Sequence, residues 1–137
     1  MATSPYGSTS GTGEREGRPL MERLMVFGLA EEVERLRGEH AWQDGDRNSR
    51  TLAKDVDFRV LLSVLRSGAT LEEGDGDARV SLHLLEGRAT LRLEAAEAEL
   101  NAGELAVVNA GQRWQLRADG DCAMLLTLAW PREKAGV

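Results

Sequence analysis

The stretch that decides the fold runs from Gly68 to Trp114. It reads GATLEEGDGDARVSLHLLEG, then RATLRLEAAEAEL, then NAGELAVVNAGQRW. Apolar residues alternate with polar ones in this stretch, as in a strand with one buried face: Val80, Leu82 and Leu84 fall on one side. Glycines bound two blocks, Gly68–Gly87 and Gly103–Gly111, and glycine is the usual residue in tight turns. The pattern predicts antiparallel strands joined by short turns.

The period of two continues on both sides of this stretch. The segment Phe58–Leu65 is apolar on nearly both faces, so it is expected to lie between two layers, either two sheets or two subunits. Near the other end, Cys122, Met124, Leu126, Leu128 and Trp130 share one face of a final strand. About eight strands with turn signals and no helix between them predict a β-sandwich or barrel.

The residues before the strands have a different pattern. Pro19–Arg37 shows apolar residues at helical spacing, with Gly28 as a kink or a break between two short helices. Glu39–Ser49 is polar and is expected to be a loop that holds Trp42. We therefore divide the chain into a disordered tail (1–17), a helix and loop (18–49), a barrel (50–131) and a frayed C-terminus (132–137).

Composition limits the possible partners. The 137 residues fit one domain, and the net charge of −6 with a pI near 5.0 argues against nucleic acid or an anionic membrane as a partner. No run approaches the ~20 apolar residues of a membrane span. The N-terminus has no apolar signal-peptide core, which predicts a cytoplasmic protein. The single cysteine, Cys122, is interpreted as a core residue rather than a reactive thiol.

The glycine spacing resembles that of the cupin superfamily, over about Arg50 to Trp130. Its first motif, G-x5-H-x-H-x3-4-E-x6-G, matches Gly68 and Gly87, and its second, G-x5-P-x-G-x2-H-x3-N, matches Gly103 and Gly111. The resemblance implies an all-β, cupin-like jelly-roll β-barrel (a double-stranded β-helix), here with an N-terminal helical segment.

The family's metal ligands do not carry over to this sequence. The resemblance places them at Gly74, Gly76, Val80 and Trp114, and none of these side chains ligates a metal. Asn109 stands at the proline position and Ala118 at the final asparagine. We therefore predict no metal and no cofactor, which removes the basis for the family's metal-dependent activities.

Nearby acids and one histidine are the residues that could rebuild a metal site. Asp75 and Asp77 each lie one residue from a ligand position, and Glu72 and Glu73 precede them. We interpret EEGDGD as a solvated acidic turn. His83 falls on the face opposite Val80, Leu82 and Leu84, so it is expected to point away from the barrel interior.

Without a metal, the barrel interior is expected to be apolar. Trp114 either fills the former cavity or forms the floor of a ligand pocket with polar groups at its rim. The candidate pocket residues are Arg59, Val80, Leu82, Leu91, Asn109, Gln112, Arg113, Trp114 and Met124.

Three functions are compatible with these features. The first is a metal-free small-molecule-binding or sensor module, which the sequence favours and which is not catalytic. The second is a structural or interaction homodimer with a filled barrel. The third is a metal-independent acid/base enzyme such as an isomerase or epimerase, which needs a His/Asp or Tyr/His pair, whereas the only tyrosine, Tyr6, lies in the tail. A homodimer through Phe58–Leu65 and the N-terminal helix is expected, since both surfaces need cover.

Overall fold

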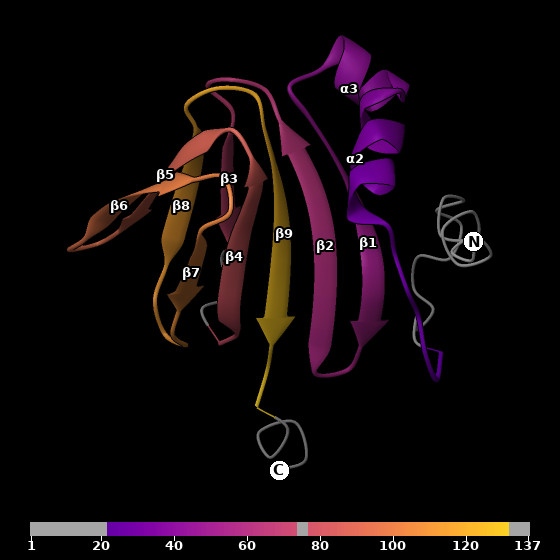
Figure 1. The fold of residues 1–137 in the computed structure, drawn as a ribbon. Coiled ribbons are helices and arrows are strands. Elements are labelled where there is room, and N and C mark those ends of the chain that lie inside the picture. The colour runs from indigo at the N-terminus through magenta and orange to yellow at the C-terminus, as the bar shows by residue number, and fades with distance from the viewer. Residues whose placement is uncertain (1–21, 74–76, 132–137) are drawn as a thin grey trace.

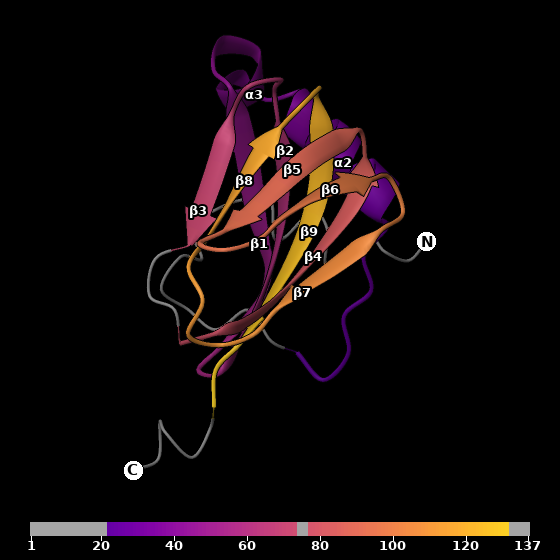
Figure 2. The same ribbon diagram turned by 90° about the vertical axis from the view of Figure 1, so that its left-hand side faces the viewer.

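The computed structural model describes residues 22–73 and 77–131, which form two antiparallel sheets and two helices (Figure 1). The sheets have the strand orders β1-β2-β9-β4-β7 and β3-β8-β5-β6, and Figure 2 views the molecule from the four-stranded side. The elements are α2 (Leu29–Arg37), α3 (His40–Asp44), β1 (Arg47–Asp55), β2 (Phe58–Leu65), β3 (Thr70–Glu73), β4 (Arg79–Glu86), β5 (Arg88–Leu93), β6 (Glu97–Asn101), β7 (Leu105–Val108), β8 (Trp114–Ala118) and β9 (Cys122–Ala129).

The main core lies between the two sheets. Alternate residues of β4 and β9 point into it, as the period of two predicts: Val80, Leu82 and Leu84 pack with Met124 and other apolar side chains. β9 lies between β2 and β4, although it is the last of the described strands in chain order. The predicted all-β jelly-roll with a small helical part is therefore confirmed.

A second core lies on the outer face of the five-stranded sheet. Helix α2 covers β1 and β2 there (Figure 1), and Val33 and Leu36 of the helix pack with Leu62 and Val64 of β2 and with Trp42. Strand β2 is thus buried on both faces, as predicted. Its two covering layers are the opposite sheet and a helix of the same chain.

Three expectations about the N-terminal part need correction. Of the predicted helix, residues 22–28 are not helical, and α2 begins after Gly28, whose backbone is extended (φ −85°, ψ 105°). The expected loop Glu39–Ser49 contains the short helix α3 with Trp42 buried, and strand β1 already begins at Arg47. The earlier part of the predicted helix and the 1–17 tail with Tyr6 lie outside the described residues, as do 132–137.

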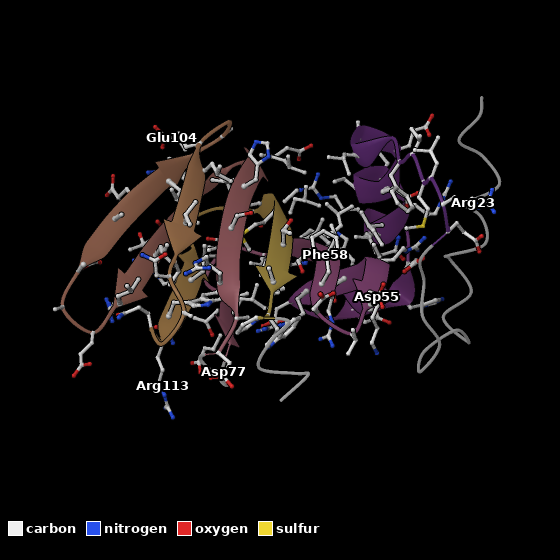
Figure 3. All side chains as sticks on the ribbon, turned by 90° about the horizontal axis from the view of Figure 1, so that it is seen from below. Arg23, Asp55, Phe58, Asp77, Glu104 and Arg113 are labelled. Atoms are coloured by element: carbon white, nitrogen blue, oxygen red, sulfur yellow. The ribbon has the colours of Figure 1, made fainter. Side chains whose placement is uncertain are left out.

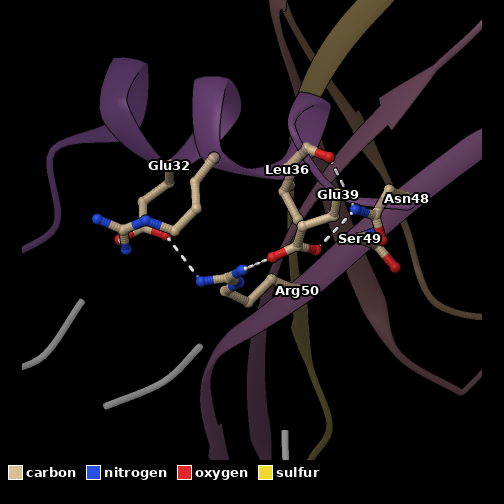
Figure 4. A network of polar contacts seen from close by, with 7 residues as sticks. Glu32, Leu36, Glu39, Asn48, Ser49 and Arg50 are labelled. Carbon is tan, nitrogen blue, oxygen red and sulfur yellow. Dashed lines mark hydrogen bonds and ion pairs between the residues drawn. The ribbon is translucent and has the colours of Figure 1, made fainter. Parts of the chain in front are cut away.

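A buried ion-pair network attaches α2 to β1 (Figure 4). Arg50, 8% exposed, donates to Glu32 at 3.4 Å and to Glu39 at 2.7 Å, and Glu32 itself is 3% exposed. Asn48 donates to the carbonyl of Leu36 and to Glu39, at 2.9 Å each. The network satisfies charged groups that would otherwise be costly to bury.

The four motif glycines share one backbone conformation. Gly68, Gly87, Gly103 and Gly111 have φ between 88° and 92°, the left-handed region that favours glycine, and within 22–73 and 77–131 no other residue has a positive φ. Gly87 also lacks room for a side chain, because a β-carbon there would lie 2.8 Å from Cβ of Cys122. The spacing of these glycines thus follows the turns of the barrel.

No helix within the described ranges is long and apolar enough to cross a membrane.

Candidate functional site

The positions that hold a metal in cupins do not suit one in this chain. Val80 is 3% exposed and Trp114 4% exposed, and both pack in the main core, where they offer no lone pair to a cation. Positions 74 and 76, and Asp75 between them, lie outside the described residues. Over 22–73 and 77–131, no three His, Cys, Asp or Glu side chains gather as a possible metal site. The residues at the two described ligand positions, 80 and 114, therefore do not fit the family's metal ion.

Glu72, Asp77 and His83 lie outside the barrel interior. Glu72 accepts a hydrogen bond from Gln115 at 3.0 Å, and Asp77 is exposed. His83 pairs with Leu105 and Leu125 and so lies on the outer face of the sheet, where it was predicted. The other histidine, His40, has a side chain that is 95% exposed on α3. The histidines are thus on the outside of the molecule.

The candidate pocket residues divide into groups with different surroundings. Val80, Leu82, Leu91 and Met124 are fully packed in the main core. Asn109, Gln112 and Arg113 lie exposed in the loop before β8, where Asn109 accepts a bond from Arg79 at 3.4 Å. Arg59 is partly buried on β2. Trp114 packs in the core and also reaches a surface pocket.

This surface pocket, called here the Trp114 pocket, is formed where β3, β8 and β5 meet at one end of the barrel. It has a volume of about 490 Å³, and its lining residues are Glu72, Arg92, Leu93, Glu94, Arg113, Trp114 and Gln115. Figure 3 shows Arg113 extending outward from this end of the barrel. The register pairs Arg92 with Gln115 and Gln115 with Glu72, which places the three polar side chains in one row on the outer face.

Arg113 and Trp114 line the same surface pocket, whereas the pocket considered from the sequence lay in the barrel interior. Arg92, Gln115 and Glu72 complete the surface pocket, and the sequence analysis named none of them for a pocket. These three side chains form one row because of the register of three strands that are far apart in the sequence. The sequence could have indicated only that Arg92 and Gln115 point outward, since both alternate with apolar neighbours.

Arg59 has different surroundings. It pairs with Leu128 across β2 and β9 and stands over the ring of Trp130, with 5.5 Å from the guanidinium carbon to the ring centre. Its Nε is buried and has no hydrogen-bond partner among the described residues. Trp130 was expected only to share a face with the core residues of β9, and this contact was not foreseen.

Two further polar or reactive groups have shifted pKa values. Asp119 accepts a hydrogen bond from Thr90 at 2.6 Å, and this bond, with a smaller effect from Arg117, lowers the pKa of Asp119. Burial raises the pKa of the Cys122 thiol to about 11, so the unreactive thiol form is favoured.

The fold and the glycine turns together define a cupin barrel, and comparisons with solved structures agree. A conserved protein of unknown function from Streptococcus pyogenes superposes with a TM-score of 0.64 at 22% identity, over 81% of this chain and 91% of that chain. A cupin superfamily protein from Desulfitobacterium hafniense gives 0.59 at 18% identity, over 62% and 78%. The cupin domain of an XRE family transcriptional regulator from Enterobacter cloacae gives 0.56 at 13% identity, over 64% and 99%.

The sequence also matches a family profile. Residues 55–136 match the AraC-binding-like domain, so the chain belongs to that family within the cupin superfamily. Comparison with functionally curated protein sequences finds no match.

Proposed function

We propose that this protein is a metal-free, non-catalytic module that binds a small molecule in the Trp114 pocket. The observation that carries the proposal is a surface pocket of about 490 Å³ at which the guanidinium groups of Arg92 and Arg113 lie beside the largely buried Trp114. This volume lies within the ~300–1,000 Å³ of typical ligand sites.

The lining residues favour a polar molecule with both donors and acceptors. The arginines donate hydrogen bonds, and Glu72 and Glu94 accept them. Arg113 has no ion pair with another described residue, and Arg92 has only a loose one with Glu97 at 3.7 Å. Both side chains can therefore turn toward a ligand at small cost.

The family match supports a sensing role. The matched family is described as AraC-binding-like, and one structural neighbour is a cupin domain of a transcriptional regulator. We propose by analogy that binding here also reports the presence of a metabolite to another protein or domain, in the cytoplasm.

A thermal-shift screen against a metabolite library tests the proposal. Compounds of one chemical class should raise the melting temperature of the wild-type protein, because a ligand that binds the folded state stabilises it. The effect should be lost in the double variant Arg92→Met/Arg113→Met and kept in the control Arg88→Met, which changes an exposed arginine at the other end of β5. A flat screen, or hits that the double variant keeps, would contradict the proposal.

A homodimer is the second candidate, and the edge of the five-stranded sheet supports it. β7 pairs only with β4 among the described strands, and its outward residues Leu105 and Val107 are 58% and 62% exposed. The surface that the sequence analysis selected, Phe58–Leu65, is already covered by α2. We propose that β7 pairs antiparallel with β7 of a second copy, with Leu105 opposite Val107 of that copy.

A further inference from the structure

Apart from Arg92 and Arg113, the structure holds another pair of cations, Arg59 and Lys54, on β2 and β1. Arg59 lies on the inner face of the five-stranded sheet, because it pairs with the core residue Leu128 and is followed on that face by Leu61. Lys54 pairs with Arg59 across β1 and β2, so the two side chains share this face. They lie near the β1–β2 turn, which Asp55 and Phe58 mark in Figure 3.

Neither cation has a carboxylate partner in the described part of the chain. The ion pairs found there involve other arginines or His40, and the only specific contact of the Arg59 guanidinium with a described residue is the ring of Trp130. The nearby carboxylate of Asp55 accepts from the backbone N–H of Val56 at 2.7 Å. Two adjacent unpaired cations are notable in a chain whose net charge is −6.

The buried Nε of Arg59 makes this arrangement costly for the free protein. A buried N–H without an acceptor destabilises a fold, and native structures rarely keep such a group unless a ligand, ion or water completes it. The ring of Trp130 holds the guanidinium in place and does not supply an acceptor.

We propose that Arg59 and Lys54 bind the carboxylate group of a small organic acid, with Trp130 fixing the guanidinium. Arginine suits a carboxylate because its planar donors match the two oxygens, and Lys54 adds a second positive charge. Neither Arg59, Lys54 nor Trp130 lines the Trp114 pocket, so this site is independent of the function proposed above.

The test is a titration of the full-length protein with sodium benzoate and sodium succinate at constant ionic strength. The indole N–H signals of the tryptophans are followed by NMR, and the signal of Trp130 is assigned from Trp130→Phe. Both acids should shift the Trp130 signal in a saturable manner. The neutral amides, benzamide and succinamide, should not.

Variants identify the residues that bind the carboxylate. Arg59→Met should weaken binding about tenfold or more, and Lys54→Met roughly two- to fivefold. Arg79→Met, which changes an exposed arginine on β4, should leave binding unchanged.

A structural role for Arg59 makes different predictions. If Arg59 serves only to hold Trp130, Arg59→Met should lower the melting temperature and leave benzoate binding in place. If it serves a ligand, Arg59→Met should fold with an unchanged or raised melting temperature, since the unpaired N–H is gone. No saturable shift in the wild-type protein, or equal binding by Arg59→Met, would overturn the proposal. Should Arg59→Met not fold, the wild-type titration still decides.

Discussion

The backbone of Gly87 passes so close to Asp121 that a side chain at position 87 would collide with the carbonyl oxygen of Asp121. Its φ of +89° adds strain for any other residue. We therefore expect Gly87→Ala to lower the free energy of unfolding by about 3 kcal/mol or more, measured by urea denaturation. Gly103→Ala, which has the same φ but open space around it, should lose only about 1 kcal/mol. Equal losses of unfolding free energy in the two variants would mean that the close approach of Gly87 to Asp121 does not affect stability.

The second prediction concerns the buried pair of Arg50 and Glu32. Arg50→Met should lower the free energy of unfolding by about 3–5 kcal/mol, because it leaves Glu32 buried with only Arg35 as a partner at 3.4 Å. Arg50→Met/Glu32→Leu should recover most of this loss. As a control, Arg92→Met breaks a pair that is about half exposed and should change stability by less than ~1 kcal/mol. A small effect of Arg50→Met would show that water reaches Glu32.

The third prediction is a pH dependence at Asp119. Since the bond from Thr90 lowers the pKa of Asp119 in the folded state, it stabilises the fold above the ordinary aspartate pKa of about 3.9. This stabilisation is lost as the pH falls through the lowered pKa. Thr90→Val should therefore cost about 1–3 kcal/mol at pH 7, and progressively less below pH ~4. Urea unfolding of the wild-type protein and of Thr90→Val between pH 7 and pH 3 measures the difference in their free energies of unfolding. If Thr90→Val destabilised the fold for a reason unrelated to Asp119, this difference would not change with pH.

The fourth prediction concerns the thiol of Cys122. Because burial raises its pKa to about 11, the thiol should resist Ellman's reagent at pH 8 in the folded protein and react fully in denaturant. The raised pKa also means that stability falls as the pH rises from the ordinary thiol value toward 11. Rapid labelling of the folded protein would show that the interior opens on the time scale of the assay.

The fifth prediction tests the dimer through β7. If Leu105 and Val107 lie in the contact, Val107→Lys should convert the dimer to a monomer, seen as a halved mass in light scattering. Val56→Lys changes a residue that is 70% exposed in the β1–β2 turn and should leave the mass unchanged. A monomeric wild-type protein at micromolar concentration would remove this candidate.

Much of the barrel was predictable because its constraints are local. The alternation in β4, β5 and β9 directly indicates which side chains enter the core. The four glycine positions indicate the turns, and each of these glycines has the positive φ that such turns require.

The N-terminal part was less predictable, for identifiable reasons. A bulge between Thr51 and Ala53 turns the neighbours Leu52 and Ala53 both toward the outer face of the sheet, and this interrupts the period of two that would have indicated β1. Between residues 22 and 28, Leu24 and Phe27 have helical spacing, but only Phe27 packs on the outer core while Leu24 is exposed. Two apolar residues three positions apart also fit an extended segment in which only one of them packs against the core.

The sites depend on contacts that a single sequence does not contain. Arg59 and Trp130 lie at the start of β2 and just beyond β9, and only the pairing of these two strands brings them together. The same holds for Glu72, Gln115 and Arg92, whose row across three strands follows from register.

The central place of β9 has a consequence for biosynthesis. Strands β2 and β4 are synthesised before β9 (Cys122–Ala129), the strand that pairs with both of them. Until β9 has been made, the nascent chain presents two unpaired apolar strand edges, which are prone to wrong association. The five-stranded sheet therefore cannot form before β9 has emerged, and chaperone binding during synthesis should concentrate on β2 and β4.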